Sequence, residues 1–230
     1  MSEVFGVKLS VVYDNESNNP DLKASWGFAC LIESGGYKVL FDTGWDGNIL
    51  LENMEKMGVD VSRIDAIVLS HNHWDHVGGL NHALSKADDA KVFVPKSFSE
   101  KLKGEIRSRT DLIEVSGKTK VFDGVYSTGE IFGEYDGARI VEQSLMLETA
   151  KGIVLVVGCS HPGLDRIIEV AKKHGNVFGV VGGFHGFDRL DALKGLGFIA
   201  PCHCTKNREL IENRFTDIVE LPSVGWVKTL

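Results

Sequence analysis

The sequence has no long hydrophobic run, no basic leader and no excess of positive charge. No window approaches the roughly 18 consecutive apolar residues that a membrane-spanning helix needs, and the first residues, MSEVFGVKLS, show no targeting pattern. We therefore expect a cytoplasmic protein with no membrane partner. The formal net charge of -7 provides no overall basic field, so we expect no nucleic-acid partner either.

Cysteine and proline are also scarce. The four cysteines, Cys30, Cys159, Cys202 and Cys204, lack the spacing of a disulfide framework, which predicts free thiols in a reducing compartment. Only 5 prolines are present, and no stretch rich in proline, serine or charge divides the chain. With 43% hydrophobic residues, the 230 residues can build a core without disulfide support, and we expect a single domain over residues 1–230.

The chain begins with predicted β structure and continues with alternating α and β segments. Apolar runs predict strands at residues 7–12, 28–32 and 38–41, the last two joined by a hairpin at Gly35 and Gly36. Helical periodicity and buried runs predict the elements that follow. Strands are expected at residues 64–69, 91–94, 152–158, 176–183 and 198–201, and helices at residues 48–57, 80–85, 99–103, 164–174, 189–196 and 206–215.

This order of elements favours an α/β fold. Two halves of mixed β and then β/α structure indicate two sheets packed face to face with helices outside, which is a four-layer αββα sandwich. The histidine-bearing segments follow the ends of predicted strands, where loops of α/β proteins converge. We therefore expect these histidines to share one pocket.

The segment SHNHWDHVGG, residues 70–79, concentrates three imidazoles and a carboxylate directly after a buried strand. In an extended segment His71 and His73 project to the same side, so both can reach one ion. A turn at Trp74 then brings Asp75 and His76 toward a second ion. Imidazole and carboxylate are ligands for zinc and also for manganese or iron, so the pattern predicts one or two metal ions and favours zinc.

Two further histidines follow predicted strands at a distance in the sequence. His161 lies in GCSHPG after the strand at residues 152–158, and His203 lies in PCHCT after the strand at residues 198–201. Each lies where a distant ligand is needed to complete a site whose other ligands come from one loop.

Taken together, these motifs resemble the motif series of the metallo-β-lactamase superfamily over essentially the whole chain. The match includes HNHWDH with its preceding strand, the upstream FDTG at residues 41–44, and the two downstream histidines. The resemblance implies two sets of ligands, His71, His73 and His161 for a first ion and Asp75, His76 and His203 for a second. It also implies that Asp42 holds the histidine loop by hydrogen bonds, since such partners orient metal ligands.

The sequence departs from that family pattern at one place. Many members have an aspartate that bridges both ions, in a stretch that here reads VVGGFHG, residues 180–186, with no carboxylate before Asp188. Two ions held close together lose the anion that screens their repulsion, so we expect a weaker second site. His185, within this stretch, is a candidate to bind one ion or to hydrogen-bond a substrate oxyanion.

The pair GGFH and PCHCT narrows the resemblance to the branch named for 7,8-dihydropterin-6-methyl-4-(β-D-ribofuranosyl)aminobenzene 5'-phosphate synthase. We expect hydrolysis of an ester, lactone or phosphate of a small molecule by metal-activated water, with Asp75 and His185 as catalytic residues. A first alternative is a transferase that condenses a dihydropterin methyl diphosphate with a ribofuranosylaminobenzene phosphate. A mononuclear iron oxygenase and a non-catalytic metal-binding module also stay open, and the substrate is expected to be phosphorylated or pterin-like.

Aromatic and thiol side chains near these motifs are expected to pack rather than to bind. Packing is favoured over stacking on a flat substrate for Trp26, Trp45, Trp74 and Phe184. Cys202 and Cys204 flank His203, and neighbouring residues on a strand point to opposite faces. We therefore predict that neither of these two thiols ligates the metal.

Overall fold

Two β-sheets form the centre of the structure, a computed structural model that describes residues 6–230. The first sheet has seven strands in the order β15-β1-β2-β3-β4-β5-β6. Its strands are β15 (Val227–Thr229), β1 (Val7–Tyr13), β2 (Ala29–Ser34), β3 (Tyr37–Phe41), β4 (Ala66–Val68), β5 (Lys91–Pro95) and β6 (Leu112–Val115). Strands β3, β4, β5 and β6 run parallel, so the ends of β3 and β4 open at the same edge.

The second sheet has six strands in the order β14-β13-β12-β11-β8-β7. Its strands are β14 (Phe198–Cys202), β13 (Val177–Gly183), β12 (Gly152–Val157), β11 (Leu145–Thr149), β8 (Val125–Ser127) and β7 (Thr119–Phe122). Strands β12, β13 and β14 are parallel neighbours. A separate hairpin, β9 (Ile131–Tyr135) with β10 (Ala138–Glu142), pairs outside both sheets.

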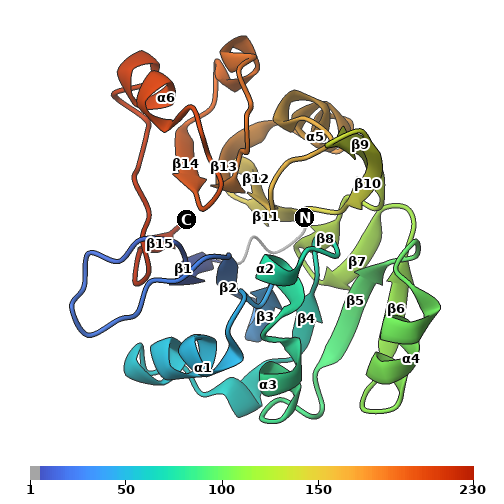
Figure 1. Cartoon of the computed structure of the whole chain (residues 1–230). Coiled ribbons are helices and arrows are strands. Elements are labelled where there is room, and N and C mark those ends of the chain that lie inside the picture. Colours follow the sequence, from blue (N-terminus) through green and yellow to red (C-terminus); the bar gives the residue numbers. More distant parts are fainter. Residues whose placement is uncertain (1–5) are drawn as a thin grey trace.

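Helices cover the outer faces of the two sheets (Figure 1). Against the first sheet pack α1 (Gly47–Lys56), α3 (Leu80–Leu84) and α4 (Glu100–Arg107), and against the second pack α5 (Leu164–Lys172), the 3-10 helix η2 (Leu190–Leu193) and α6 (Arg208–Arg214). A third apolar cluster joins the sheets, with Phe41 and Val68 on one side and Val154 and Val181 on the other. The four-layer αββα prediction is confirmed.

Helix α1 shows how the sequence produces one of these outer layers. Asp46 is its N-cap and accepts hydrogen bonds from the backbone N–H of Asn48 at 2.8 Å and of Ile49 at 3.3 Å. Apolar residues at helical spacing then put Leu50 and Met54 on one face, where both are fully buried against the first sheet. The helix therefore forms because capping and burial agree along the same ten residues.

The predicted elements match most of this architecture, and one is wrong. The segment predicted as a helix at residues 189–196 forms only the short η2, because the backbone leaves the helical region on both sides of it, at Arg189 with a ψ of 58° and at Gly195 with a φ of 83°. Strand β15 was not predicted, since its three residues on a sheet edge have no buried side chain. The remaining helices are short: η1 (Val61–Arg63) and α2 (Trp74–Val77). No helix within residues 6–230 is long and apolar enough to cross a membrane.

Candidate metal centre

Three loops bring the predicted ligands to one edge of the two sheets. The loop after β4 carries the histidine motif, in which His73 is the N-cap of α2 and Asp75 and His76 lie on that short helix. His161 follows β12, and His203 follows β14. Because β12 and β14 both pair in parallel with β13, their carboxyl ends lie close together. The expectation that these histidines follow strand ends and share one place is confirmed.

The first group contains His71, His73 and His161. Their ligand nitrogens all lie within 4.8 Å of one another, a separation that one ion between them can span. The Nε2 atom of His71 is 3.1 Å from the Nδ1 atom of His73. The ring of His161 stands 4.8 Å from that of His71 and 4.9 Å from that of His73. These three side chains therefore converge as one set.

The second group contains Asp75, His76 and His203, whose ligand atoms also lie within 4.8 Å of one another. The Nε2 atom of His203 is 3.1 Å from Oδ2 of Asp75, and this oxygen also accepts a hydrogen bond of 2.9 Å from the indole N–H of Trp26. The side chains of His76 and His203 are fully buried. The rings of His71 and His76 are 4.2 Å apart, so the two groups are adjacent.

Asp42 orients ligands in both groups. Its Oδ2 atom accepts hydrogen bonds of 2.7 Å from His76 Nδ1 and from the hydroxyl of Ser70, and its Oδ1 atom accepts one of 2.7 Å from the backbone N–H of Ser70. Since the Ser70 proton goes to Asp42, the serine oxygen can only accept from His71 Nδ1, which lies 2.8 Å away. The hydrogen bonds expected of Asp42 are present in the structure.

The two distant histidines are held in the same way. His161 Nδ1 lies 3.1 Å from Oε2 of the buried Glu142, which also accepts from the backbone N–H of His161 at 3.0 Å. His203 Nδ1 lies 2.9 Å from Oδ1 of Asn15, whose amide nitrogen donates to the His203 carbonyl at 3.0 Å. The same Asn15 oxygen accepts from the backbone N–H of Gly27, which fixes the amide orientation.

This outer network tests whether the residues suit a metal ion. With Nδ1–H donated outward, the Nε2 lone pairs of His71, His76, His161 and His203 all point into the site. His203 Nε2 then faces a carboxylate oxygen of Asp75 at 3.1 Å, so two acceptors meet and need a proton or a cation between them. The donor set of nitrogen and carboxylate oxygen therefore fits a divalent transition metal.

The charge state of the ligands also suits metal binding. Burial lowers the pKa of His71 and His73, and it lowers the pKa of His76 to about 3, so these imidazoles are neutral at pH 7. Burial raises the pKa of Asp75, but the neighbouring imidazoles of His203 and His76 outweigh this effect and hold the pKa well below its usual value. Neutral imidazoles and an ionised carboxylate are the forms that bind metal.

Left-handed backbone gathers around the centre. Asp42, Ser160, His185 and His203 have φ of 58°, 60°, 45° and 47°, although none of them is glycine. Such residues cost about 1–3 kcal/mol each and persist where the surroundings fix them. At His203 the surrounding hydrogen bonds hold this backbone conformation. Asp14 accepts a hydrogen bond from its backbone N–H at 3.0 Å, and Asn15 bonds to its ring and to its carbonyl.

Sequence reasoning missed four contributors to the site, which are Asn15, Glu142, Cys159 and Cys204. Cys202 is buried in the core, which agrees with the packing predicted for it. The Cys204 thiol instead lies within 4.8 Å of the ligand atoms of Cys159 and His203. The strand alternation used for the prediction ends at His203, where the positive φ redirects the chain. In the sequence, GCSH places Cys159 and HCT places Cys204 beside candidate ligands, and this proximity is the signal that points to the two thiols.

His185 lies beside the first ligand group, and the four aromatic residues for which packing was predicted differ in burial. The His185 ring is 5.1 Å from that of His161, but it joins none of the groups of ligand atoms found in residues 6–230. Burial lowers its pKa, which keeps it neutral at pH 7. Phe184 is fully buried, as the packing prediction states, whereas three tryptophans are not core residues. Those exposed by more than half are Trp26, Trp45 and Trp74.

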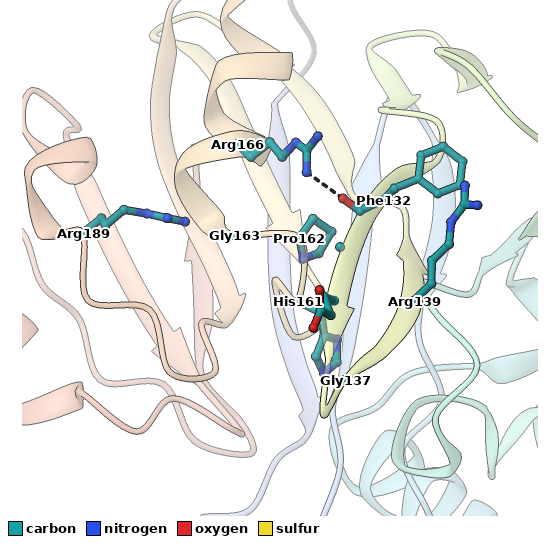
Figure 2. A pocket seen from close by; sticks show the side chains of 10 residues that line it. Phe132, Gly137, Arg139, His161, Pro162, Gly163, Arg166 and Arg189 are labelled. Atoms are coloured by element: carbon teal, nitrogen blue, oxygen red, sulfur yellow. Dashed lines mark hydrogen bonds between the residues drawn. The ribbon is translucent and has the colours of Figure 1, made fainter.

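An open cavity of about 720 Å³ lies beside His161 (Figure 2). The β9–β10 hairpin forms one wall, and three arginines from different elements line it, Arg139 on β10, Arg166 on α5 and Arg189 before η2. Arg166 donates to the carbonyl of Phe132 at 2.8 Å, and Arg139 lies 4.1 Å from the centre of the Phe132 ring. The hairpin also supplies Tyr135, whose ring stands 4.7 Å from that of His161. The cavity therefore joins the first ligand group to a positively charged wall.

Comparison with known sequences gives a family and relatives. The model of the Metallo-beta-lactamase superfamily matches residues 27–167. An uncharacterized protein of Methanocaldococcus jannaschii is 31% identical over 218 residues, which cover 79% of this chain and 84% of the relative. The 7,8-dihydropterin-6-methyl-4-(beta-D-ribofuranosyl)-aminobenzene-5'-phosphate synthase of the same organism is 29% identical over 233 residues, covering 77% of this chain and 79% of that protein.

Solved structures show the same fold. The crystal structure of Tm1679, described as a metal-dependent hydrolase of the beta-lactamase superfamily, matches with a TM-score of 0.80 and 26% identity, covering 97% of this chain and 99% of that chain. The metallo-beta-lactamase fold protein YhfI from Bacillus subtilis matches with a TM-score of 0.74 at 14% identity, covering 98% of this chain and 100% of that chain. The family match over more than half of the chain and the folded arrangement of its motifs agree, and the chain belongs to the metallo-beta-lactamase superfamily.

Proposed function

We propose that this protein is a metal-dependent hydrolase that cleaves an ester or phosphate bond of an anionic small molecule, with two zinc ions in the two ligand groups. The observation that carries the proposal is that His161, which groups with His71 and His73, also lines the arginine-lined cavity. When bound there, a zinc ion lowers the pKa of water toward roughly 7 and polarises a substrate oxygen.

The residues of the chain have separate parts in this proposal. The Asp42 and Glu142 carboxylates fix the imidazole tautomers, so that nitrogen lone pairs rather than N–H groups face the reacting atoms. Asp75 uses Oδ2 toward His203 and Trp26, which leaves Oδ1 to accept a hydrogen bond from the attacking water. His185, neutral and near His161 at the rim, donates a hydrogen bond to the oxyanion that develops on the substrate.

The arginine wall supports an anionic substrate. Arg139, Arg166 and Arg189 line the cavity with one acidic lining residue, Glu134, and Arg189 also pairs with Asp165 at 2.6 Å. A guanidinium binds the oxygens of phosphate or carboxylate through a planar pair of N–H groups. We therefore expect the charged end of the substrate in this wall and the bond to be broken beside His161.

The test is hydrolysis by the zinc-loaded protein of a panel that contains phosphate mono- and diesters, carboxylic esters and lactones. We expect activity on a phosphorylated member, and we expect His161→Ala to abolish it. His174→Ala, at an exposed histidine after α5, is the matched control and keeps the activity of the wild type. An Arg166→Ala variant raises KM for the anionic substrate more than it lowers kcat. Hydrolysis that survives His161→Ala contradicts the proposal.

A transferase is the second candidate, favoured by the 29% identical synthase of Methanocaldococcus jannaschii and by the aromatic residues at the rim. Tyr135 lies over the site with its ring 5.4 Å from that of His73 and 5.1 Å from that of His185, where a flat pterin ring can stack. The discriminating assay supplies a dihydropterin methyl diphosphate with a ribofuranosylaminobenzene phosphate. Release of pyrophosphate that requires the second substrate supports transfer, and release without it supports hydrolysis.

A further inference from the structure

Two thiols lie beside the second ligand group. Cys159 belongs to two of the groups whose ligand atoms lie within 4.8 Å of one another, one with His71 and His76 and the other with His203 and Cys204. Its sulfur therefore lies near ligands from the loop after β4 and also near the ligand that follows β14. The function proposed above uses neither thiol.

The contact between Cys159 and His76 is the most informative one. The sulfur lies 3.1 Å from Nε2 of His76, and Asp42 takes the proton on the other ring nitrogen at 2.7 Å. The nitrogen that faces the sulfur therefore carries a lone pair. With no ion bound, the thiol hydrogen of Cys159 donates to this lone pair. When that proton leaves, the sulfur and the nitrogen are two donor atoms close enough to hold one ion between them.

The position of Cys159 is fixed by the structure around it. Its backbone N–H donates to Glu142 Oε1 at 2.9 Å, and the residue is only 3% exposed. Across the sheet, a Cβ atom on Gly183 would lie 3.3 Å from the Cα of Cys159 and 2.7 Å from the sulfur of Cys204. Glycine at 183 therefore leaves room for both cysteine residues.

We propose that Cys159 Sγ is a ligand of the second ion together with Asp75, His76 and His203. On binding, the S–H bond breaks, its proton goes to water, and the thiolate donates an electron pair to the ion. A soft sulfur ligand favours zinc over manganese at this site, since manganese prefers oxygen ligands. The inference rests on the metal-dependent function proposed above, because it assigns one more ligand to that centre.

The experiment is X-ray absorption at the zinc edge on the wild type and three matched variants, Cys159→Ser, Cys204→Ser and Cys202→Ser. Sulfur and nitrogen or oxygen ligands are separable, because zinc–sulfur distances are about 2.3 Å and zinc–nitrogen or zinc–oxygen distances about 2.0–2.2 Å. We expect a sulfur shell in the wild type that disappears only in Cys159→Ser. Cys202 is a control of similar burial whose sulfur contacts the carbonyl of Ala200.

The outcomes separate the two proposals. Zinc bound by nitrogen and oxygen alone in the wild type overturns the sulfur ligand but leaves the metal-dependent function standing, and no variant is needed to see it. A sulfur shell that survives in Cys159→Ser and vanishes in Cys204→Ser shows that Cys204 is the ligand, which also overturns the inference. A wild type that binds no zinc at all overturns both. Charge-transfer absorption from sulfur in the cobalt-substituted wild type, lost in Cys159→Ser, supports the assignment independently.

Discussion

Replacing Glu142 by glutamine is the sharpest test of how the centre is organised. The carboxylate accepts four hydrogen bonds, from the backbone N–H groups of Cys159, Ser160 and His161 and from His161 Nδ1, at 2.9, 2.9, 3.0 and 3.1 Å. Burial raises its pKa, but the hydrogen bond from His161 and the neighbouring imidazole of His71 outweigh this effect and hold the pKa well below its usual value. A glutamine has one accepting oxygen, so its NH2 group faces two of these donors.

The expected cost has two parts. A buried backbone N–H without an acceptor lowers the free energy of unfolding by about 1–3 kcal/mol. The NH2 group also favours the His161 tautomer with a proton on Nε2, which blocks the lone pair that faces the site. Loss of such an outer partner lowers metal affinity about 10–100-fold, equivalent to about 1.4–2.8 kcal/mol.

The assay is competition for zinc against a chromophoric chelator, with urea unfolding of the metal-free protein measured in parallel. Glu148→Gln, at an exposed position on β11, is the matched control and changes neither quantity. If Glu142→Gln binds zinc as tightly as the wild type, the tautomer argument for the first ligand group is wrong.

Three further predictions follow from single contacts. His71→Ala removes the metal from the first group, and elemental mass spectrometry showing the wild-type content in this variant refutes its assignment. Leu50→Ala lowers the free energy of unfolding by about 2–5 kcal/mol because Leu50 is fully buried, while Leu210→Ala, at a residue that is 57% exposed, changes it by less than about 0.5 kcal/mol. Burial raises the pKa of Cys30 to about 12 from 9.0, so the unfolded chain loses this proton at lower pH than the folded chain and stability falls as pH rises above 9. Urea unfolding measures this effect. Between pH 9 and 10.5 the free energy of unfolding of the wild type falls by about 2 kcal/mol more than that of Cys30→Ala, and an equal fall in both proteins contradicts a raised pKa of Cys30.

The site residues that could be predicted from the sequence all belong to a local sequence pattern, which is a buried strand followed closely by a ligand. His71, His73, Asp75 and His76 lie within six residues after a buried strand, so their convergence requires only the strand and one turn. His161 could be placed because it follows closely after a strand of six residues, five of which are apolar and buried.

Glu142 and Asn15 could not be found in this way. Glu142 lies at the end of a hairpin strand, and the backbone N–H groups that make it important come from residues 159–161. Asn15 follows β1 and meets His203 at a separation of 188 residues. Such partners depend on the docking of distant loops, which periodicity does not describe. The helix predicted at residues 189–196 was wrong for another reason, because apolar spacing does not reveal the positive φ of Gly195, which a helix cannot continue through.

The division of the ligands between the sheets has a consequence for the life of the protein. The loop after β4 belongs to the first sheet, while His161 and His203 belong to the second, so each bound ion ties one half of the molecule to the other. Removing the ions leaves only apolar packing and hydrogen bonds such as those from Gln143 to the carbonyls of Leu69 and Phe93 to hold the halves together. With the proposed ions in place, we therefore expect the metal-free chain to open more often and to be cleaved by proteases sooner than the metal-bound chain.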